Sequence, residues 1–373
     1  MHELTHPWGT LTLYRWPRRR NETLQAWDNA DRYLLNTLAE RAQQPGQTLV
    51  INDSHGALSL AVAQCGEGGV VASGDSWLAM DNIQRNAGIN ELTPVNYCWP
   101  DEDLPSAADR VLMRVPKSLA LLEAQLSWLS AQLAEGVPVW LSGMDKHLPR
   151  QLVSLLEKYL GNGQAEYGWK KARLFSATAP GKVLAVAPYP SKVESPTGSL
   201  VVHAGVFSQQ QLDIGARFFL DHLPDHLPRE PRIADLGCGN GVIGLAVLQQ
   251  HPDAHVTFCD ESWLALKSAR ENVAACFPEA KVVFHHGDGL LGLEGGFDCI
   301  LLNPPFHEGH TVGDHVARRL FRQASKQLNE GGELRVIGNQ HLGYHKQLGR
   351  LFGQVEVVGS NRKFVVLSCR EPK

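Results

Sequence analysis

The chain has 373 residues, of which 43% are hydrophobic and 20% charged, and its formal net charge is −4. This composition is typical of a folded protein of about two domains and excludes a mainly disordered chain. No apolar run reaches the roughly 18 residues that a membrane span needs, and residues 1–10 lack a signal-peptide pattern. We therefore expect a cytoplasmic protein without a membrane partner. The seven cysteines form no Cys-x-x-Cys pair, which argues against both a disulfide framework and a zinc site.

Residues 11–20 predict a short strand that ends in a cluster of arginines interleaved with Tyr14 and Trp16. Arginines beside aromatic rings suit contact with phosphates and stacked bases, although a charged strand edge that discourages aggregation has the same pattern. Because the net charge is negative, a nucleic-acid contact would have to be a local basic patch. A helix is predicted over 23–42, ended by Pro45 and Gly46.

The order strand, glycine-containing turn, helix, strand, helix occurs twice in the chain. Residues 49–60 align with 234–245, so that Gly56 meets Gly241, and residues 76–86 align with 262–272, where both segments contain Ser-Trp-Leu-Ala. Further along, residues 109–117 align with 298–306. This repeat predicts an α/β chain with two tandem Rossmann-like domains, each built on a doubly wound, mainly parallel sheet.

The domain boundaries follow from the repeat and from a proline-rich stretch. We expect a first domain over 1–178, a linker over 179–199 and a second domain over 200–373. A strand is possible at 183–187 within the linker, and a helical stretch over 212–223 introduces the second domain.

A glycine-rich segment at 233–245 is the strongest single signal for a ligand. It reads as a short apolar strand followed by glycines at 237, 239, 241 and 244. Glycines in a strand-to-helix turn allow positive φ and close approach of a ligand to the backbone. Alone, this segment suits NAD as well as other nucleotide-like ligands.

Parallel sheets bind ligands at the carboxyl ends of their strands, and four predicted strand ends carry suitable residues. Asp260 and Glu261 follow the glycines at the spacing that allows a carboxylate to bind ribose hydroxyls, and Asp288 is placed to meet an adenine edge. The predicted cofactor-binding residues are Asp235, Gly237, Cys238, Gly239, Asn240, Gly241, Asp260, Glu261, Asp288 and Asn303.

The fourth strand end, Asn303-Pro304-Pro305-Phe306, favours methyl transfer over hydride transfer. The lone pair of a planar amine is delocalised into its ring, so the amine attacks a methyl donor poorly. The Asn303 side chain and a backbone carbonyl can accept its N–H groups, while the prolines stiffen the loop and Phe306 stacks on the ring. In-line transfer from a sulfonium then depends on positioning. The predicted cofactor is therefore a sulfonium methyl donor, with these four residues as the catalytic segment.

His307, His310 and His315 resemble a metal-binding cluster. We expect no metal there, because the sequence shows no carboxylate-backed geometry around them.

The first half lacks the features that the second half uses for this chemistry. Asn52 and Ser54 stand where Gly237 and Gly239 stand, and Arg114 and Lys117 replace Asn303 and Phe306. The first domain is therefore predicted to be a degenerate methyltransferase-like domain, and we hypothesise that it binds RNA. The candidate RNA-binding residues are Arg15, Arg18, Arg19, Arg20, Arg114, Lys117, Lys170, Lys171 and Arg173, each of which could instead belong to a solvated face.

Taken together, these motifs resemble the class I S-adenosylmethionine-dependent methyltransferases. The degenerate first copy, with Asp-Leu-Gly-Cys-Gly-Asn-Gly and Asn-Pro-Pro-Phe in the second, is similar to the bacterial ribosomal RNA guanine-N2 methyltransferases. Segments 24–34, 115–123, 169–174, 212–219 and 363–367 resemble the group that modifies the large subunit. The resemblance implies methylation of the exocyclic N2 amine of one guanine in 23S rRNA, either naked or in an assembling particle, with that base unpaired or flipped out.

Alternatives remain open at this point. A small-subunit 16S rRNA guanine-N2 methyltransferase and a protein glutamine-N5 methyltransferase share the catalytic motif. A dinucleotide oxidoreductase and a non-enzymatic RNA-binding assembly factor are alternatives from other classes.

Overall fold

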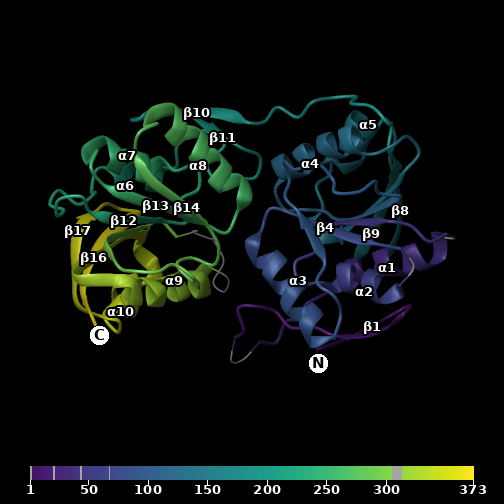
Figure 1. The fold of residues 1–373 in the computed structure, drawn as a ribbon, viewed down its shortest axis with the longest axis horizontal. Helices are drawn as coiled ribbons and strands as arrows, with labels where there is room; N and C mark the ends of the chain where they lie inside the picture. The colour runs from purple at the N-terminus through teal and green to yellow at the C-terminus, as the bar shows by residue number, and fades with distance from the viewer. Residues whose placement is uncertain (1, 20–21, 43, 67, 305–312) are drawn as a thin grey trace. The chain divides into compact units, whose positions relative to one another are not determined.

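The computed structural model describes residues 2–19, 22–42, 44–66, 68–304 and 313–373 of the chain. The chain divides into two compact units, Met1–Tyr189 and Pro190–Lys373, each with its own sheet and helices (Figure 1). The boundary between the units falls inside the segment that we expected to be a linker.

The first unit begins with a hairpin and continues into a seven-stranded sheet. The hairpin pairs β1 (Glu3–His6) with β2 (Gly9–Thr12). The sheet order is β5-β4-β3-β6-β7-β9-β8. Its strands are β3 (Thr48–Ile51), β4 (Val70–Ser73), β5 (Asn96–Cys98), β6 (Arg110–Arg114), β7 (Pro138–Met144), β8 (Gln164–Trp169) and β9 (Ala172–Thr178). Its helices are α1 (Asn29–Arg41), α2 (Ala57–Cys65), α3 (Trp77–Ile89), α4 (Leu119–Gln132) and α5 (Leu152–Leu160).

The second unit repeats this plan. Its hairpin pairs β10 (Ser191–Ser195) with β11 (Gly198–Val202), and its sheet order is β14-β13-β12-β15-β16-β18-β17. The sheet strands are β12 (Arg232–Leu236), β13 (His255–Asp260), β14 (Lys281–His286), β15 (Phe297–Leu302), β16 (Leu328–Asn339), β17 (Phe352–Ser360) and β18 (Phe364–Pro372). The helices are α6 (Ile214–Leu220), α7 (Val242–Gln250), α8 (Trp263–Cys276), α9 (Gly313–Gln327) and α10 (Tyr344–Leu348).

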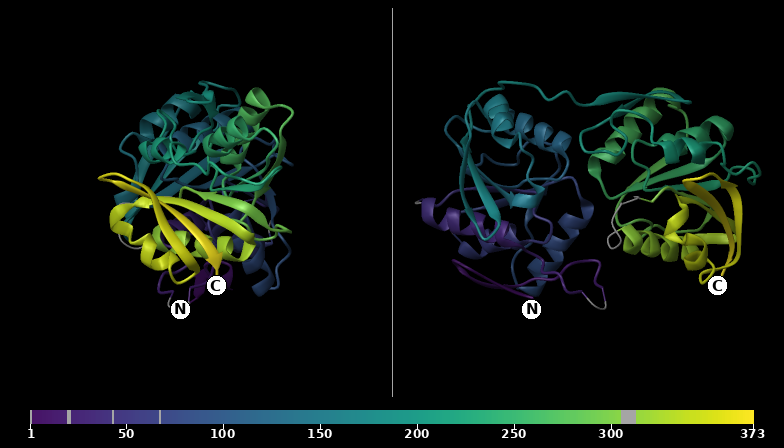
Figure 2. Two further views of the ribbon diagram at one scale, coloured as in Figure 1. Left: turned by 90° about the vertical axis from the view of Figure 1, so that its left-hand side faces the viewer. Right: turned by 180° about the vertical axis from the view of Figure 1, so that it is seen from behind.

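Both sheets confirm the predicted α/β fold with two Rossmann-like units. In each sheet five neighbouring strands pair in parallel. Two further strands pair antiparallel at one edge: β18 with β16 and β17 with β18 in the second unit, and β9 with β7 and β8 with β9 in the first. Figures 1 and 2 show helices on both faces of each sheet. In the first unit α1, α2 and α3 share one buried apolar cluster, and α4 and α5 share another. The strand order reverses between β3 and β6 and between β12 and β15, which are the places where such folds bind ligands.

Three local predictions differ from the structure. The helix predicted over 23–42 starts only at Asn29, because the Asp28 side chain caps it and Asp31 returns a bond to the Asp28 backbone. The strand considered at 183–187 is wrong, since that segment has no regular structure and the first strand after it is β10. The helical stretch predicted over 212–223 is shorter, Ile214–Leu220.

All seven cysteines are free, as expected, and five of them are buried. Within the described ranges, none of the helices combines the length and apolar character needed to cross a membrane.

Candidate active site

The glycine loop of the second unit presents its backbone to open space. It joins β12 to α7, and Gly237, Gly239 and Gly241 have φ values of 73°, 54° and 84°. A Cβ built at Gly237 or Gly239 would meet no heavy atom within 4 Å. These positive φ values favour glycine, and the loop leaves room for a ligand to lie against the main chain.

Asp235 places a buried carboxylate at the base of this loop. The residue is 1% exposed, and its Oδ2 accepts a 2.8 Å hydrogen bond from the Gly244 amide. Its Oδ1 is buried and has no hydrogen-bond partner among the described residues. Burial raises the pKa of Asp235 to about 7, and the neighbouring Asp260 adds to that rise. A ligand that donates a hydrogen bond or carries positive charge would satisfy this oxygen.

Asp260 connects the glycine loop to the next strand. Its Oδ2 accepts from the Gly239 amide at 2.9 Å, and its Oδ1 accepts from the Ser262 amide at 3.0 Å. Burial raises the pKa of this carboxyl group as well. Glu261 follows it, and its carbonyl oxygen lies 3.1 Å from His286 Nε2. The acid at the end of β13 thus fixes the loop, and it remains half-buried at the same sheet edge.

Asn303 lies directly beside the glycine loop. It follows β15, whose Leu302 pairs with Leu236 at the end of β12. The Asn303 side-chain oxygen is buried and accepts no hydrogen bond from any residue that the structure describes. Pro304 is buried. Pro305 and Phe306, the other two predicted catalytic residues, lie outside the described residues, as do His307 and His310.

The remaining predicted cofactor residues lie at the same edge. Asn240 is 4% exposed, and its Oδ1 accepts from Val242 N while its Nδ2 is buried without a partner in the described part of the chain. Burial raises the pKa of Cys238 well above its usual range, so its thiol is not a nucleophile at neutral pH. Asp288, after β14, is 5% exposed and lies next to Asp260, because the Gly287 amide donates to the Asp260 carbonyl.

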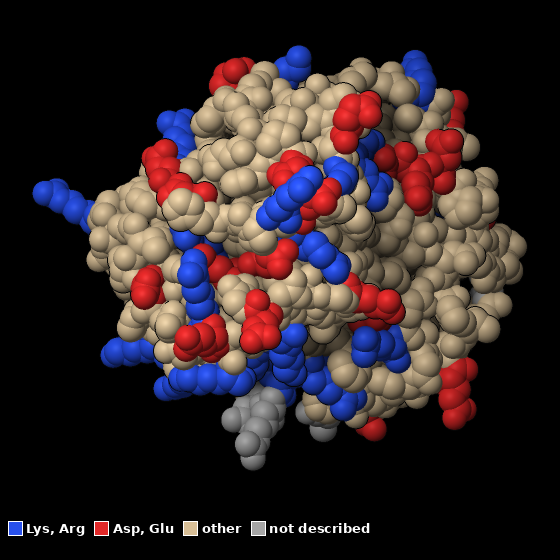
Figure 3. Space-filling model, turned by 60° about the vertical axis from the view of Figure 1, so that its left-hand side comes forward, with Lys and Arg blue, Asp and Glu red and all other residues tan. Residues whose placement is uncertain are grey.

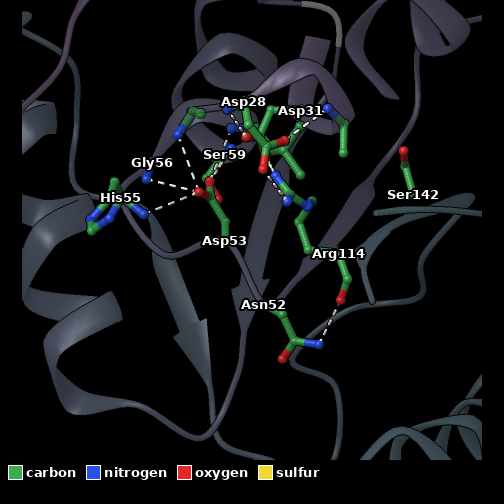
Figure 4. Close-up of polar contacts among 12 residues, drawn as sticks. Asp28, Asp31, Asn52, Asp53, His55, Gly56, Ser59, Arg114 and Ser142 are labelled. Carbon is green, nitrogen blue, oxygen red and sulfur yellow. Dashed lines mark hydrogen bonds and ion pairs between the residues drawn. The ribbon is translucent and has the colours of Figure 1, made fainter. Parts of the chain in front are cut away.

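At the equivalent edge of the first unit, the chain's own side chains take the place of a ligand (Figure 4). Asn52 keeps the left-handed backbone of Gly237, with φ of 62° against 73°. Asp53 is 3% exposed, and its carboxylate accepts hydrogen bonds from the amides of His55, Gly56, Ala57, Leu58 and Ser59 at 2.8 to 3.3 Å. The Asp53 carboxylate thus accepts the hydrogen bonds of the backbone amides at the start of α2.

Arg114, the counterpart of Asn303, is also internally paired (Figure 4). Its guanidinium forms ion pairs with Asp28, at 2.9 Å, and with Asp31, while Asn52 Nδ2 donates to its carbonyl oxygen. Because two carboxylates match this charge and the side chain is only 20% exposed, Arg114 is not accessible for a contact with RNA, contrary to the prediction. Sequence reasoning missed Asp28 and Asp31 as partners, although Asp-x-x-Asp before an apolar run is a capping signal.

The other candidate cations gather at this carboxyl edge. The Trp16 amide donates to Asn82 of α3 at 2.7 Å, which places the arginine segment along the helix that follows β4. Ala172 pairs with Met144, so the Lys170-Lys171 turn lies at the carboxyl end of β7. The exposed or half-buried candidates at this edge are Arg15, Arg18, Arg19, Lys117, Lys170, Lys171 and Arg173. Arg20 lies outside the described residues.

Aromatic rings accompany two of these cations. The Arg18 guanidinium lies 3.9 Å from the Tyr14 ring centre and 4.3 Å from that of Trp16, and Lys170 Nζ lies 4.7 Å from that of Trp169. Elsewhere charges are mixed: on the face drawn in Figure 3, basic side chains are interspersed with acidic ones and gather toward its lower edge.

The described residues contain no group of three or more His, Cys, Asp or Glu side chains that could hold a metal ion. His315 is exposed, whereas the other two histidines of the sequence cluster are not described.

Comparison with known proteins agrees with this geometry. The family described as RLMG N-terminal domain matches residues 1–181, and the family described as methyltransferase small domain matches residues 197–368. A ribosomal RNA large subunit methyltransferase G from Alcanivorax borkumensis is 64% identical over 98% of this chain and 96% of its own length. A protein of the same name from Pseudomonas fluorescens is 47% identical over 99% of both chains.

A solved structure shares the two-unit fold. It is a 16S rRNA N2 methyltransferase from T. thermophilus in complex with AdoMet and guanosine, with a TM-score of 0.76, 21% identity, and coverage of 99% of this chain and 97% of its own. At that identity it supports the fold. The identity and coverage of the full-length relatives show that this chain belongs to the ribosomal RNA large subunit methyltransferase G family.

Proposed function

We propose that this protein transfers a methyl group from S-adenosyl-L-methionine to the exocyclic N2 amine of one guanine in 23S ribosomal RNA. The observation that carries the proposal is the buried side-chain oxygen of Asn303, which accepts no hydrogen bond from the described residues and lies beside the open glycine loop. Family membership favours this function over a dinucleotide oxidoreductase and over a purely structural assembly factor. A ribosomal RNA substrate also makes the cytoplasm the expected compartment.

The second unit offers polar groups that fit this cofactor. Asp235 Oδ1, which has no hydrogen-bond partner within the described part of the chain, suits the ammonium of the methionine moiety, and the open backbone at Gly237 and Gly239 suits a ligand lying across the loop. In this proposal Asp260, with Glu261 after it, binds the ribose hydroxyls, and Asp288 binds the adenine amine. The bound cofactor supplies an electrophilic methyl group.

The chain's own contribution to the chemistry is positioning. Asn303 Oδ1 accepts an N–H of the guanine amine and holds the nitrogen with its lone pair toward the methyl group. Pro304 stiffens this loop, and Pro305 and Phe306 are proposed from sequence to continue it, with Phe306 stacked on the base. No group other than these oriented acceptors is needed in the step, because the amine proton is lost to solvent after transfer.

The experiment compares Asn303→Ala with the wild type, using S-adenosylmethionine labelled in its methyl group and rRNA from cells that lack this protein. We expect a loss of transfer of about hundredfold, as for removal of an oriented hydrogen-bonding group at other active sites, while cofactor binding persists. Retained transfer would refute the role of Asn303.

Nucleoside analysis of the product separates the competing substrates. Label in N2-methylguanosine from 23S rRNA supports the proposal, whereas label in 16S rRNA or in a glutamine-containing protein supports the alternatives. Presenting naked 23S rRNA and large-subunit particles in parallel shows which of them is the substrate.

We further propose that the basic edge of the first unit binds this RNA. Support comes from the stacked Arg18 and from the Lys170-Lys171 turn, where both lysines have positive φ, at 48° and 66°. Tight turns of this kind usually carry Asn and Gly, and lysines there are strained by about 1 kcal/mol each or more. Such strain is consistent with a functional need for two exposed cations.

A further inference from the structure

One face of α9 holds the loop that follows β14. Arg319 Nη2 lies 2.9 Å from Asp288 Oδ1, and these side chains are 25% and 7% exposed. One turn later, Gln323 Nε2 donates to the Asp288 carbonyl at 3.1 Å, and its Oε1 accepts from the Leu290 amide at 2.9 Å. Arg319 and Gln323 therefore fix both the backbone of this loop and the carboxylate at its start.

The loop is packed tightly against this helix face. Gly289 has φ of 64°, and a Cβ built there would lie only 2.0 Å from Gln323 Oε1. The Gly287 amide donates to the Asp260 carbonyl at 3.1 Å on the other side. Asp288 is thus held between the acid at the end of β13 and helix α9, with little freedom to turn.

We propose that Arg319 is a positioning residue that sets the adenine preference of the cofactor site by placing a positive charge beside the Asp288 carboxylate and holding it in one orientation. The inference rests on the proposed function, in which Asp288 meets the adenine amine. Arg319 itself touches Asp288 and acts on the cofactor through it.

The reason lies in the hydrogen-bonding capacity of a buried carboxyl group. A buried carboxyl without a cation favours its neutral form, which can donate as well as accept. A guanidinium partner keeps it ionised, and an ionised carboxylate only accepts. Such an acceptor binds the amine of adenine and repels the carbonyl oxygen that hypoxanthine carries at the same position.

The test measures affinity of the full-length protein for S-adenosylhomocysteine and S-inosylhomocysteine by calorimetry. We expect the wild type to prefer the adenine compound by at least tenfold, and Arg319→Met to lower that preference by about tenfold, mainly by weakening the adenine compound. Arg319→Lys keeps the charge and should restore part of the preference. The matched control is Arg322→Met, which removes an exposed arginine from the same helix and should leave the preference unchanged.

Asp288→Asn separates failure of this inference from failure of the proposed cofactor role. An amide can turn to donate or accept, so this variant should bind both compounds about equally. If Asp288→Asn loses the preference while Arg319→Met keeps it, the inference about Arg319 is wrong and the role of Asp288 stands. If Asp288→Asn keeps the preference, Asp288 does not read the adenine edge.

A structural role alone would weaken both compounds by the same factor in Arg319→Met, and that result would overturn the proposal. Tighter binding of the adenine compound by Arg319→Met would overturn it too, because Arg319 would then compete with the ligand for Asp288. Thermal unfolding without ligand checks the fold, and Arg319→Gln replaces Arg319→Met in the same comparison if the latter does not fold.

Discussion

Asn86 in α3 and Asn272 in α8 make the same three hydrogen bonds in the two units of the chain. Asn86 Oδ1 accepts from the Tyr14 amide, and its Nδ2 donates to the carbonyls of Tyr14 and His55 at 2.9 and 2.8 Å. Asn272 Oδ1 accepts from the Val201 amide, and its Nδ2 donates to the carbonyls of Val201 and Asn240 at 2.8 and 3.0 Å. Each asparagine thus joins the N-terminal segment of its unit, its own helix and the loop before the preceding helix.

Replacing either asparagine by alanine should destabilise its unit. Asn86 and Asn272 are 0% and 2% exposed, so alanine leaves buried backbone groups unpaired. We expect a loss of about 1–3 kcal/mol in the free energy of unfolding for each variant, measured with urea. Asn272→Ala should also weaken S-adenosylhomocysteine binding, because Asn240 belongs to the proposed cofactor loop, whereas Asn86→Ala should leave that affinity unchanged.

Asn90→Ala is the control for this comparison. Asn90 bonds the same hairpin through Thr12 but is only half-buried, so its loss should be smaller. Equal loss of ligand affinity in Asn86→Ala and Asn272→Ala would show that the effect is general destabilisation and not the position of the loop.

The asparagine pair illustrates what could be predicted from sequence. Both residues close the aligned segments 76–86 and 262–272, and the repeat itself was recognised from Ser-Trp-Leu-Ala in both. The Ser-Trp-Leu-Ala motif can be recognised from sequence because Ser76 and Ser262 cap their helices through short-range hydrogen bonds from the Ala79 and Ala265 amides. The role of the asparagines was not visible, because their hairpin partners lie 72 and 71 residues away.

Some residues of the candidate site could likewise be predicted from sequence, and others could not. Gly237, Asp235 and Asn303 were predictable because strand ends and glycine spacing are local patterns, and the fold brings strand ends together. The pairing of Arg114 with Asp28 and Asp31 was not, because it depends on how α1 packs near β6. Charge alone could not distinguish that internally paired guanidinium from the exposed Arg18.

Asp53→Ala should strongly destabilise the first unit. Its buried carboxylate accepts from five amides around the start of α2, and alanine would leave these donors unpaired. We expect a loss of about 2–4 kcal/mol in unfolding free energy, more than for an ordinary helix cap, and a smaller loss for Asp53→Asn, which keeps one acceptor oxygen.

The wild type and Asp53→Asn also test whether the first unit can bind a cofactor. Calorimetry should give one S-adenosylhomocysteine per chain in the wild type and in Asp53→Asn, since Arg114 replaces Asn303 there. Binding of a second equivalent in the wild type would contradict the degeneracy of this unit.

Arg18→Gln should weaken RNA binding without changing cofactor binding. Its exposed guanidinium lies against Tyr14 and Trp16 at the basic edge, where it can contact a phosphate. Losing one phosphate contact should lower the slope of log affinity against log salt by about one for a single-stranded or duplex site. Filter binding with a 23S rRNA fragment over a salt series measures this.

Arg110→Gln is the matched control, because Arg110 lies at the opposite, amino end of β6 and contacts the Gln44 carbonyl. It should leave the affinity and the salt slope at the wild-type values. Equal effects of the two substitutions would show that the basic edge has no special role in RNA binding.

Cofactor affinity should depend on pH through Asp235. Burial raises the pKa of this carboxyl group to about 7 in the folded protein, above its ordinary value of about 4. Between these values the folded state holds a proton that the unfolded state releases, so the ligand-free protein should lose stability as pH rises from about 4 to 7. A ligand ammonium beside Oδ1 favours the ionised form, so binding should expel this proton below pH 7.

The affinity for S-adenosylhomocysteine should therefore rise with pH, by up to about tenfold per unit, and level off above about pH 7. Calorimetry in two buffers of different ionisation enthalpy measures both the affinity and the proton released. Asp235→Asn should reduce the slope, with a remainder from Asp260, whose pKa burial also raises. An unchanged slope in Asp235→Asn would mean that its Oδ1 does not face the ligand ammonium, and the orientation proposed for the cofactor would have to be reversed.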